Sequence, residues 1–194
     1  SELANIVPVG SLTFFTANDG VNGVELWRRD GTVGGTILLK DIYSGSSSSN
    51  PQELTAVGSM LFFTADDGVN GVELWQSDGT VAGTVLVKDI GPGFGSSSPS
   101  YLTAIGNTLY FRADDGVNGA ELWQSDGTAA GTVLMKDIVA GSGTPSLQSL
   151  TAVGDKLYFL AEDGVNGREL WKSDGTEAGT ILVKDLCPGS GTYG

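Results

Sequence analysis

The sequence predicts an all-β fold built from four copies of one unit, and three observations support this prediction. The tryptophans Trp27, Trp75, Trp123 and Trp171 are spaced by 48 residues each time, with no insertion or deletion between them. Each copy contains short β-rich runs separated by turn residues, and the chain has 30 glycines. No segment shows the sustained 3.6-residue periodicity of a helix. A fixed period of this length is typical of repeat architectures.

The second copy illustrates the strands and turns expected in every unit. Gly58-Ser59 supplies the first turn, ADDGVNG the second and SDGT the third, because Gly, Asn and Asp favour tight turns. These turns separate four expected strands, at residues 54–57, 60–65, 72–76 and 84–90. Each copy therefore predicts a four-stranded antiparallel sheet.

The strands contain runs such as LFF and VLV, which are apolar on both faces. A sheet packed between two neighbours requires this pattern, whereas a sheet with one solvated face does not. The sequence therefore predicts a β-propeller of four blades in one domain spanning 1–194. The expected blades are approximately 1–50, 51–98, 99–146 and 147–194. Two alternatives stay open: two chains forming one eight-bladed ring, and an excerpt of a longer array.

The turn between the third and fourth strands carries a specific motif. The segments ELWRRDGTVGGT, ELWQSDGTVAGT, ELWQSDGTAAGT and ELWKSDGTEAGT resemble the bacterial ELWxxDGT repeat family, and the resemblance covers essentially the whole chain. It implies propeller-like blades in large secreted or surface proteins, with no defined activity attached to the motif. The strand order also resembles that of WD-repeat blades. The size is similar to hemopexin-like four-bladed propellers, although a single Cys187 leaves no disulfide to close such a ring.

Composition excludes several classes of function. The formal net charge is −13, and the few Lys and Arg residues are not clustered, so nucleic acid is an unfavourable partner. The absence of His removes the usual general base and every His-containing triad. No apolar run approaches the 18 residues of a membrane span, and the N-terminal SELANIVPVG lacks the pattern of a signal peptide. We therefore expect no membrane insertion, and a secreted or cell-surface location follows only from the repeat resemblance.

The ADDGVNG turn and the Glu that follows it are the candidate metal site. Carboxylate, amide and backbone oxygens within a few residues are the ligands that calcium prefers, although the spacing is not that of an EF-hand. Two interpretations stay open: a calcium site, or a hairpin turn satisfied by its own Asp and Asn. The candidate ligands in the four copies are Asp19, Asn22 and Glu25; Asp67, Asn70 and Glu73; Asp115, Asn118 and Glu121; and Asp163, Asn166 and Glu169.

The remaining recurrent residues are interpreted as mainly structural. The SDGT turn predicts a hairpin lock, in which Asp78 accepts backbone hydrogen bonds. The four tryptophans are expected to pack between blades, with sugar stacking as a weaker ligand-binding alternative. Each fourth strand ends in a Lys-Asp pair such as Lys88-Asp89, for which an ion pair or a charged strand edge is expected.

These features predict a non-enzymatic extracellular binding or scaffold module, calcium-stabilised if the acidic turns hold the ion. Its four near-equivalent sites would take a glycan or a protein. A self-assembling structural propeller, including a homodimer, is one alternative. A glycoside hydrolase using paired carboxylates is a weaker one, because catalytic sites are usually single while repeated sites suit multivalent capture.

Overall fold

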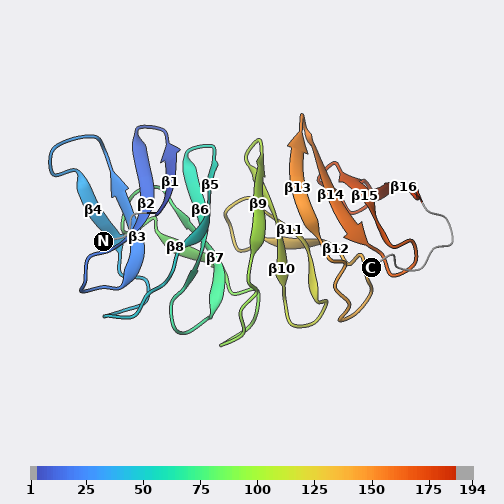
Figure 1. The fold of residues 1–194 in the computed structure, drawn as a ribbon, viewed down its shortest axis with the longest axis horizontal. Coiled ribbons are helices and arrows are strands. Elements are labelled where there is room, and N and C mark those ends of the chain that lie inside the picture. Colours follow the sequence, from blue (N-terminus) through green and yellow to red (C-terminus); the bar gives the residue numbers. More distant parts are fainter. Residues whose placement is uncertain (1–3, 187–194) are drawn as a thin grey trace. The chain divides into compact units, whose positions relative to one another are not determined.

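The computed structural model describes residues 4–186, and Cys187 lies outside them. Those residues form sixteen β-strands and no α-helix. The strands make four separate four-stranded antiparallel sheets, each joined in sequence order by hairpins (Figure 1). We number these sheets as blades 1 to 4. The prediction of an all-β chain with four-stranded blades is confirmed.

Each blade contains a first strand of six residues, a second of seven, a third of six and a fourth of four or five. Blade 1 contains β1 (Ala4–Val9), β2 (Leu12–Asn18), β3 (Val24–Arg29) and β4 (Thr36–Lys40). Blade 2 contains β5 (Gln52–Val57), β6 (Met60–Asp66), β7 (Val72–Ser77) and β8 (Val85–Lys88). Blade 3 contains β9 (Ser100–Ile105), β10 (Thr108–Asp114), β11 (Ala120–Ser125) and β12 (Val133–Lys136). Blade 4 contains β13 (Gln148–Val153), β14 (Lys156–Glu162), β15 (Arg168–Ser173) and β16 (Ile181–Lys184).

The first strand of every blade has an irregular register with the second, which the sequence pattern did not indicate. One residue near its start has a positive φ between 54° and 58°, which is uncommon outside glycine. These residues are Asn5, Glu53, Tyr101 and Ser149. An extra unpaired residue bends the strand at this point, as β-bulges do.

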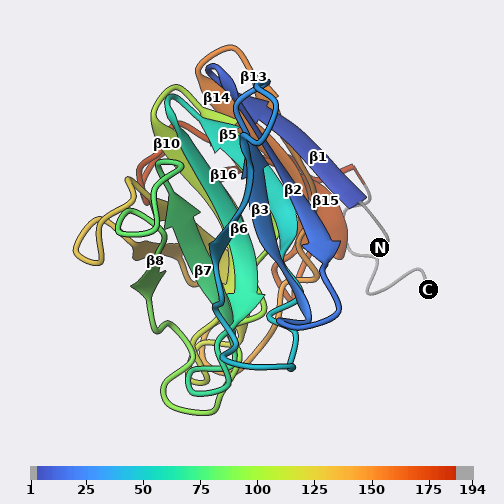
Figure 2. The same cartoon turned by 90° about the vertical axis from the view of Figure 1, so that its left-hand side faces the viewer.

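The chain divides into two compact units, residues 1–98 and 99–194, and each unit contains two blades. In the first unit, Phe14 and Leu26 of blade 1 pack in one buried cluster with Phe63 and Trp75 of blade 2. Figure 2 shows β1–β3 lying beside β5–β7. In the second unit, a corresponding cluster includes Trp171 of blade 4. In blades 2 and 3, side chains from both faces are buried, which accounts for the doubly apolar strands.

Candidate functional site

The Asp and Asn of the DGVNG turn bind each other. Asp67 Oδ1 accepts the backbone N–H groups of Val69 and Asn70, at 2.9 and 2.8 Å. The Asn70 side-chain amide donates to Asp67 Oδ2 at 2.8 Å. Partial burial raises the pKa of Asp67, but these hydrogen bonds outweigh it and hold the pKa below its usual value. The turns at Asp19, Asp115 and Asp163 are closed in the same way.

The third candidate ligand, Glu73, binds elsewhere. Its carboxylate is fully buried and accepts the backbone N–H groups of Ile90, Gly91 and Ser97, at 3.1, 3.0 and 2.9 Å, as well as the Ser97 hydroxyl. These donors belong to the segment that links blade 2 to the next blade. Burial raises the pKa of Glu73, and the hydrogen bonds oppose that rise. The structure therefore joins Asp67 to Asn70 but places Glu73 at the base of the link.

The glutamate of the third copy accepts fewer hydrogen bonds from its link than Glu73 does. Glu25 accepts hydrogen bonds from Ile42 and Ser49, whereas Glu121 accepts only the N–H groups of Ile138 and Val139 among the bonds that involve its link. The position of Ser49 and Ser97 is occupied by Pro145 in the third copy, and proline has neither an N–H nor a hydroxyl. Burial, opposed by these fewer bonds, raises the pKa of Glu121 to about 7. Glu169 accepts the N–H of Leu186 at 3.3 Å.

The link lies directly against the DGVNG turn. Ser96 Oγ accepts the backbone N–H of Val72 at 2.9 Å. Gly71 has φ +68°, and a Cβ built on it would lie 2.7 Å from the Gly95 carbonyl oxygen. Gly23 and Gly119 have similarly close link carbonyls, at 2.1 and 2.2 Å. The glycine of the Asn-Gly pair is therefore required both by its backbone conformation and by the passing link.

The SDGT turn is a hairpin lock, as expected. Asp78 Oδ1 accepts the backbone N–H and the hydroxyl of Thr80, at 2.8 and 2.7 Å. The Thr80 hydroxyl in turn accepts the N–H of Gly83 at 2.9 Å, and Ser77 and Thr84 share a buried hydroxyl hydrogen bond. These internal bonds hold the pKa of Asp78 below its usual value. The side chains of Ser77, Asp78, Thr80 and Thr84 therefore all take part in hydrogen bonds within this turn.

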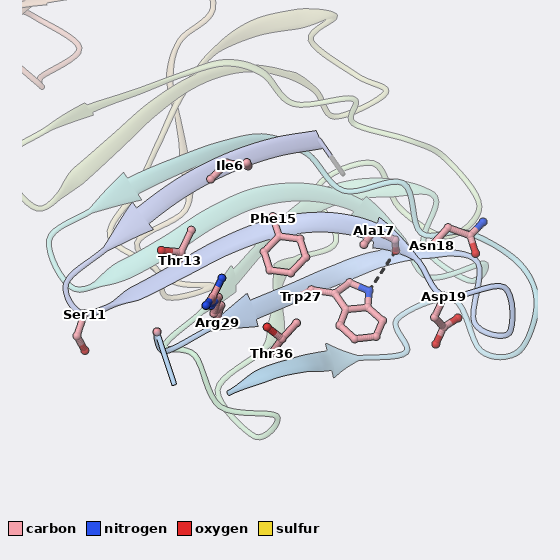
Figure 3. Close-up of a pocket in the computed structure, with 11 residues that line it drawn as sticks. Ile6, Ser11, Thr13, Phe15, Ala17, Asn18, Asp19, Trp27, Arg29 and Thr36 are labelled. Carbon is pink, nitrogen blue, oxygen red and sulfur yellow. Dashed lines mark hydrogen bonds between the residues drawn. The ribbon is translucent and has the colours of Figure 1, made fainter. Parts of the chain in front are cut away.

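The tryptophans do not share one environment. Trp75, Trp123 and Trp171 are buried, so the structure leaves no open ring face for a sugar at these three positions. Trp27 is half-buried and lines a groove of about 700 Å³ on blade 1, together with Phe15, Thr13, Arg29 and Asp19 (Figure 3). The Trp27 indole N–H donates to the Ala17 carbonyl at 3.1 Å, which fixes its orientation. Ligand binding by tryptophan remains a prediction for Trp27.

Two further predictions concern charged groups. Lys40 and Lys136 each donate at 2.9 Å to a threonine carbonyl of the following blade, at Thr84 and Thr180 respectively. For these two lysines, the expected ion pair is replaced by a hydrogen bond between blades.

Within residues 4–186, no three His, Cys, Asp or Glu side chains gather closely enough to hold a metal ion. That part of the chain also has no helix long and apolar enough to cross a membrane.

The anchoring role of the four glutamates was missed at the sequence level. Its signal is an acid in the same register of all four copies, in the middle of an otherwise apolar strand such as VELW. A buried carboxylate must find hydrogen-bond donors, so this pattern indicates an internal anchor rather than a surface ligand.

Comparison with known proteins finds structures with a similar fold but no matching family. No protein-family model matches the sequence, and no curated protein matches it significantly. A puromycin hydrolase structure is similar over 97% of this chain and 30% of its own, with 14% identity and a TM-score of 0.65. TolB from Acinetobacter baumannii is similar over 92% of this chain and 43% of its own, with 14% identity and a TM-score of 0.53. The chain thus spans less than half of either protein.

The four antiparallel sheets and these similarities define the class of protein as β-propeller-like and built from repeated blades. At these identities the similarity concerns the fold alone. The ELWxxDGT motif is present in the chain, and it remains a resemblance because no family model supports it.

Proposed function

We propose that this chain is a non-enzymatic binding and scaffold module of a secreted or cell-surface bacterial protein. It presents four near-equivalent turns to a repetitive glycan or protein ligand. The observation that carries the proposal is a valine at the tip of each DGVNG turn, held in solvent by the Asp below it. These valines, Val21, Val69, Val117 and Val165, are 61–76% exposed.

A fixed turn suits this function because little conformational entropy is lost when a ligand binds. Each valine and its neighbouring Asp and Asn offer only a small apolar and polar surface, so a single turn binds weakly. Four copies on one chain convert weak binding into useful avidity when the ligand is itself repetitive. A polysaccharide or a repeated peptide has that property.

The state of the carboxylates supports a binding role over glycoside hydrolysis. A glycosidase needs two carboxyl groups on either side of the scissile bond, one of which acts as an acid with a raised pKa. Glu73 has a raised pKa but is fully buried and engaged by its link. The exposed Asp19 and the half-buried Asp67 have lowered pKa values and are engaged in their turns.

The proposal is tested by screening glycan and peptide arrays and measuring the affinity of any ligand found. Val→Ser substitutions at Val21, Val69, Val117 and Val165, introduced one after another, should weaken binding with each added change. Val81→Ser is the matched control, because Val81 is also exposed but lies in the SDGT turn. Binding that survives all four substitutions, or turnover of a glycoside, would reject the proposal.

A further inference from the structure

One face of blade 1 lacks the cover that the equivalent face of blade 2 has. In blade 2, Leu61, Phe63, Ser77 and Thr84 on this face are completely buried against blade 1 or within the blade. Their counterparts 48 residues earlier are Thr13, Phe15, Arg29 and Thr36, and they are half-buried or exposed. These residues line the groove beside Trp27. We call this surface the Trp27 face.

The opposite face of blade 4 is uncovered in a complementary way. In blade 3, Leu122 and Met135 are buried in the cluster that also contains Trp171 of blade 4. Their counterparts in blade 4, Leu170 and Val183, are 38% and 43% exposed, and Leu186 is 68% exposed. Leu170, Val183, Leu186 and the neighbouring Val153 form what we call the Leu170 face. It is an apolar surface of the kind that receives a Trp-bearing blade elsewhere in the chain.

The contact between blades 1 and 2 shows how these two kinds of face fit together. Lys40 Nζ of blade 1 lies 5.6 Å from the centroid of the Trp75 ring and donates to the Thr84 carbonyl. A Cβ on Gly79 of blade 2 would lie 2.3 Å from Leu12 Cδ1 of blade 1. On the Leu170 face the residue equivalent to Lys40 is Lys184, which is exposed. On the Trp27 face the groups equivalent to Trp75 and Thr84 are Trp27 and Thr36.

Each uncovered face also carries a charged residue where the other three blades have a small polar one. Arg29 replaces the buried serine found at positions 77, 125 and 173, and the small Thr13 pairs with it across β2 and β3. Asp155 replaces Ser11, Ser59 and Asn107, next to Lys156 at the position of Leu12. Because Leu12 and Gly79 touch in the internal contact, an equivalent contact would bring Lys156 against Gly31. Arg29 would then lie beside Asp155 and Lys156 beside Asp30.

We propose that the Leu170 face of one chain docks on the Trp27 face of a second copy of the same chain. The docked faces reproduce the internal contact between blades, with Lys184 over Trp27 and on the Thr36 carbonyl, and with Arg29 paired to Asp155. A contact between two different faces of one protein is head-to-tail, and it closes when two chains make it reciprocally. Eight blades lie within the range of known propellers. This inference is independent of the ligand proposed above.

The chain itself argues for a second copy as the occupant. Each face is the continuation of a contact that the chain already makes, and the matching residues are encoded in the same sequence. A fully covered indole buries up to about 250 Å², and the half-buried Trp27 has the still-exposed part of that area to contribute. A random apolar partner would not require the Arg29 and Asp155 replacements to be complementary.

Native mass spectrometry and light scattering on the full chain test the proposal, in reducing buffer so that Cys187 cannot link chains. We expect an assembly of twice the 20.0 kDa chain mass. Trp27→Ala should yield monomers, while Val69→Ser, on an exposed turn of blade 2, should leave the assembly intact. Circular dichroism of the separated monomers checks that Trp27→Ala remains folded. A folded wild-type chain that stays monomeric at high micromolar concentration overturns the proposal. This holds also if the monomer packs its own Trp27 and Leu170 faces against each other.

Charge reversal identifies the partner face. Arg29→Asp and Asp155→Arg should each weaken association about tenfold or more, because each places like charges opposite one another. The double variant, Arg29→Asp with Asp155→Arg, should restore association, since both contacts of a head-to-tail pair then regain opposite charges. Failure of the double variant to recover, with both single variants impaired, overturns the pairing. An assembly indifferent to both single reversals overturns it as well.

Discussion

The Glu73 carboxylate accepts the backbone N–H of Ser97 at 2.9 Å, and the two residues lie 24 positions apart in the sequence. This bond ties the centre of the third strand of blade 2 to the end of the segment that leaves the blade. The same Ser97 residue donates its hydroxyl to the other carboxylate oxygen. A strand residue thereby positions the loop that covers the DGVNG turn, so the turn and the link form one structural unit.

Replacing Glu73 with Gln should destabilise the protein by about 2–3 kcal/mol, because the amide group places N–H donors against the donors of the link. The midpoint of denaturant unfolding measures this change. Glu177→Gln is the matched control and should alter the unfolding free energy by less than about 0.5 kcal/mol, because Glu177 is exposed. Equal effects of the two variants would contradict the anchoring role of Glu73.

The raised pKa of Glu121 leads us to expect a specific pH dependence of the free energy of unfolding. Its pKa is raised to about 7 from the ordinary 4.5, so the folded state binds a proton more tightly than the unfolded state. The contribution of Glu121 to stability therefore decreases as the pH rises from about 4.5 to about 7, and it is constant above that range.

Pro145→Ser tests this dependence, because it restores both donors found at Ser97. Relative to the wild type, the variant should gain about 1 kcal/mol more at pH 8 than at pH 4, since a hydrogen bond to a charged group is worth about that much or more. Unfolding curves across the pH range measure the difference. Glu121→Gln, which cannot titrate, should flatten the same part of the profile. A constant offset between Pro145→Ser and the wild type would contradict the assignment.

Two glycines in the first DGVNG turn allow the cost of a left-handed backbone conformation to be measured apart from the cost of steric crowding. Both have a positive φ, but only Gly23 lies against other atoms. Gly20 has φ +84° with nothing within 4 Å of a built Cβ, whereas Gly23 has φ +73° and the Ser47 carbonyl carbon at 2.6 Å. Gly20→Ala should cost about 1 kcal/mol, the usual price of a left-handed residue. Gly23→Ala should cost about 1–3 kcal/mol more, because the link must move. Thermal unfolding of both variants gives the comparison, and equal costs would show that the link does not restrain the turn.

From the acidic DGVNG turns we expect calcium to stabilise the folded protein. A cation that binds only the folded state raises the free energy of unfolding by about 2.7 kcal/mol at a concentration of 100 Kd. The melting temperature should therefore be higher in millimolar calcium than with a chelator, with magnesium as the comparison ion. No difference between calcium and chelator would remove the metal interpretation and leave Asp67 and Asn70 as turn residues.

Much of the fold followed from periodicity. The spacing of Trp27 and Trp75 defined the repeat, and turn residues such as Gly58 and Asp78 separated the four strands, because local backbone preferences act within a few residues. The second-copy strands were expected at 54–57, 60–65, 72–76 and 84–90, and the structure extends the first three by one or two residues at their ends while shortening the last. The left-handed residue near the start of each first strand gave no signal, since Asn5, Glu53, Tyr101 and Ser149 share no residue type.

The sequence by itself determined the number of units, the strand order within each unit and the closed SDGT turn, because all of these depend on residues close together in the chain. Only the tertiary structure separated Glu73 from Asp67 and Asn70, since the donors that attract its carboxylate lie 17 to 24 residues further on. Tertiary packing also distinguished Trp27 from Trp75, although both occupy the same position in nearly identical strands. Burial depends on what lies against a face, and that is a property of the neighbouring blade rather than of the strand itself.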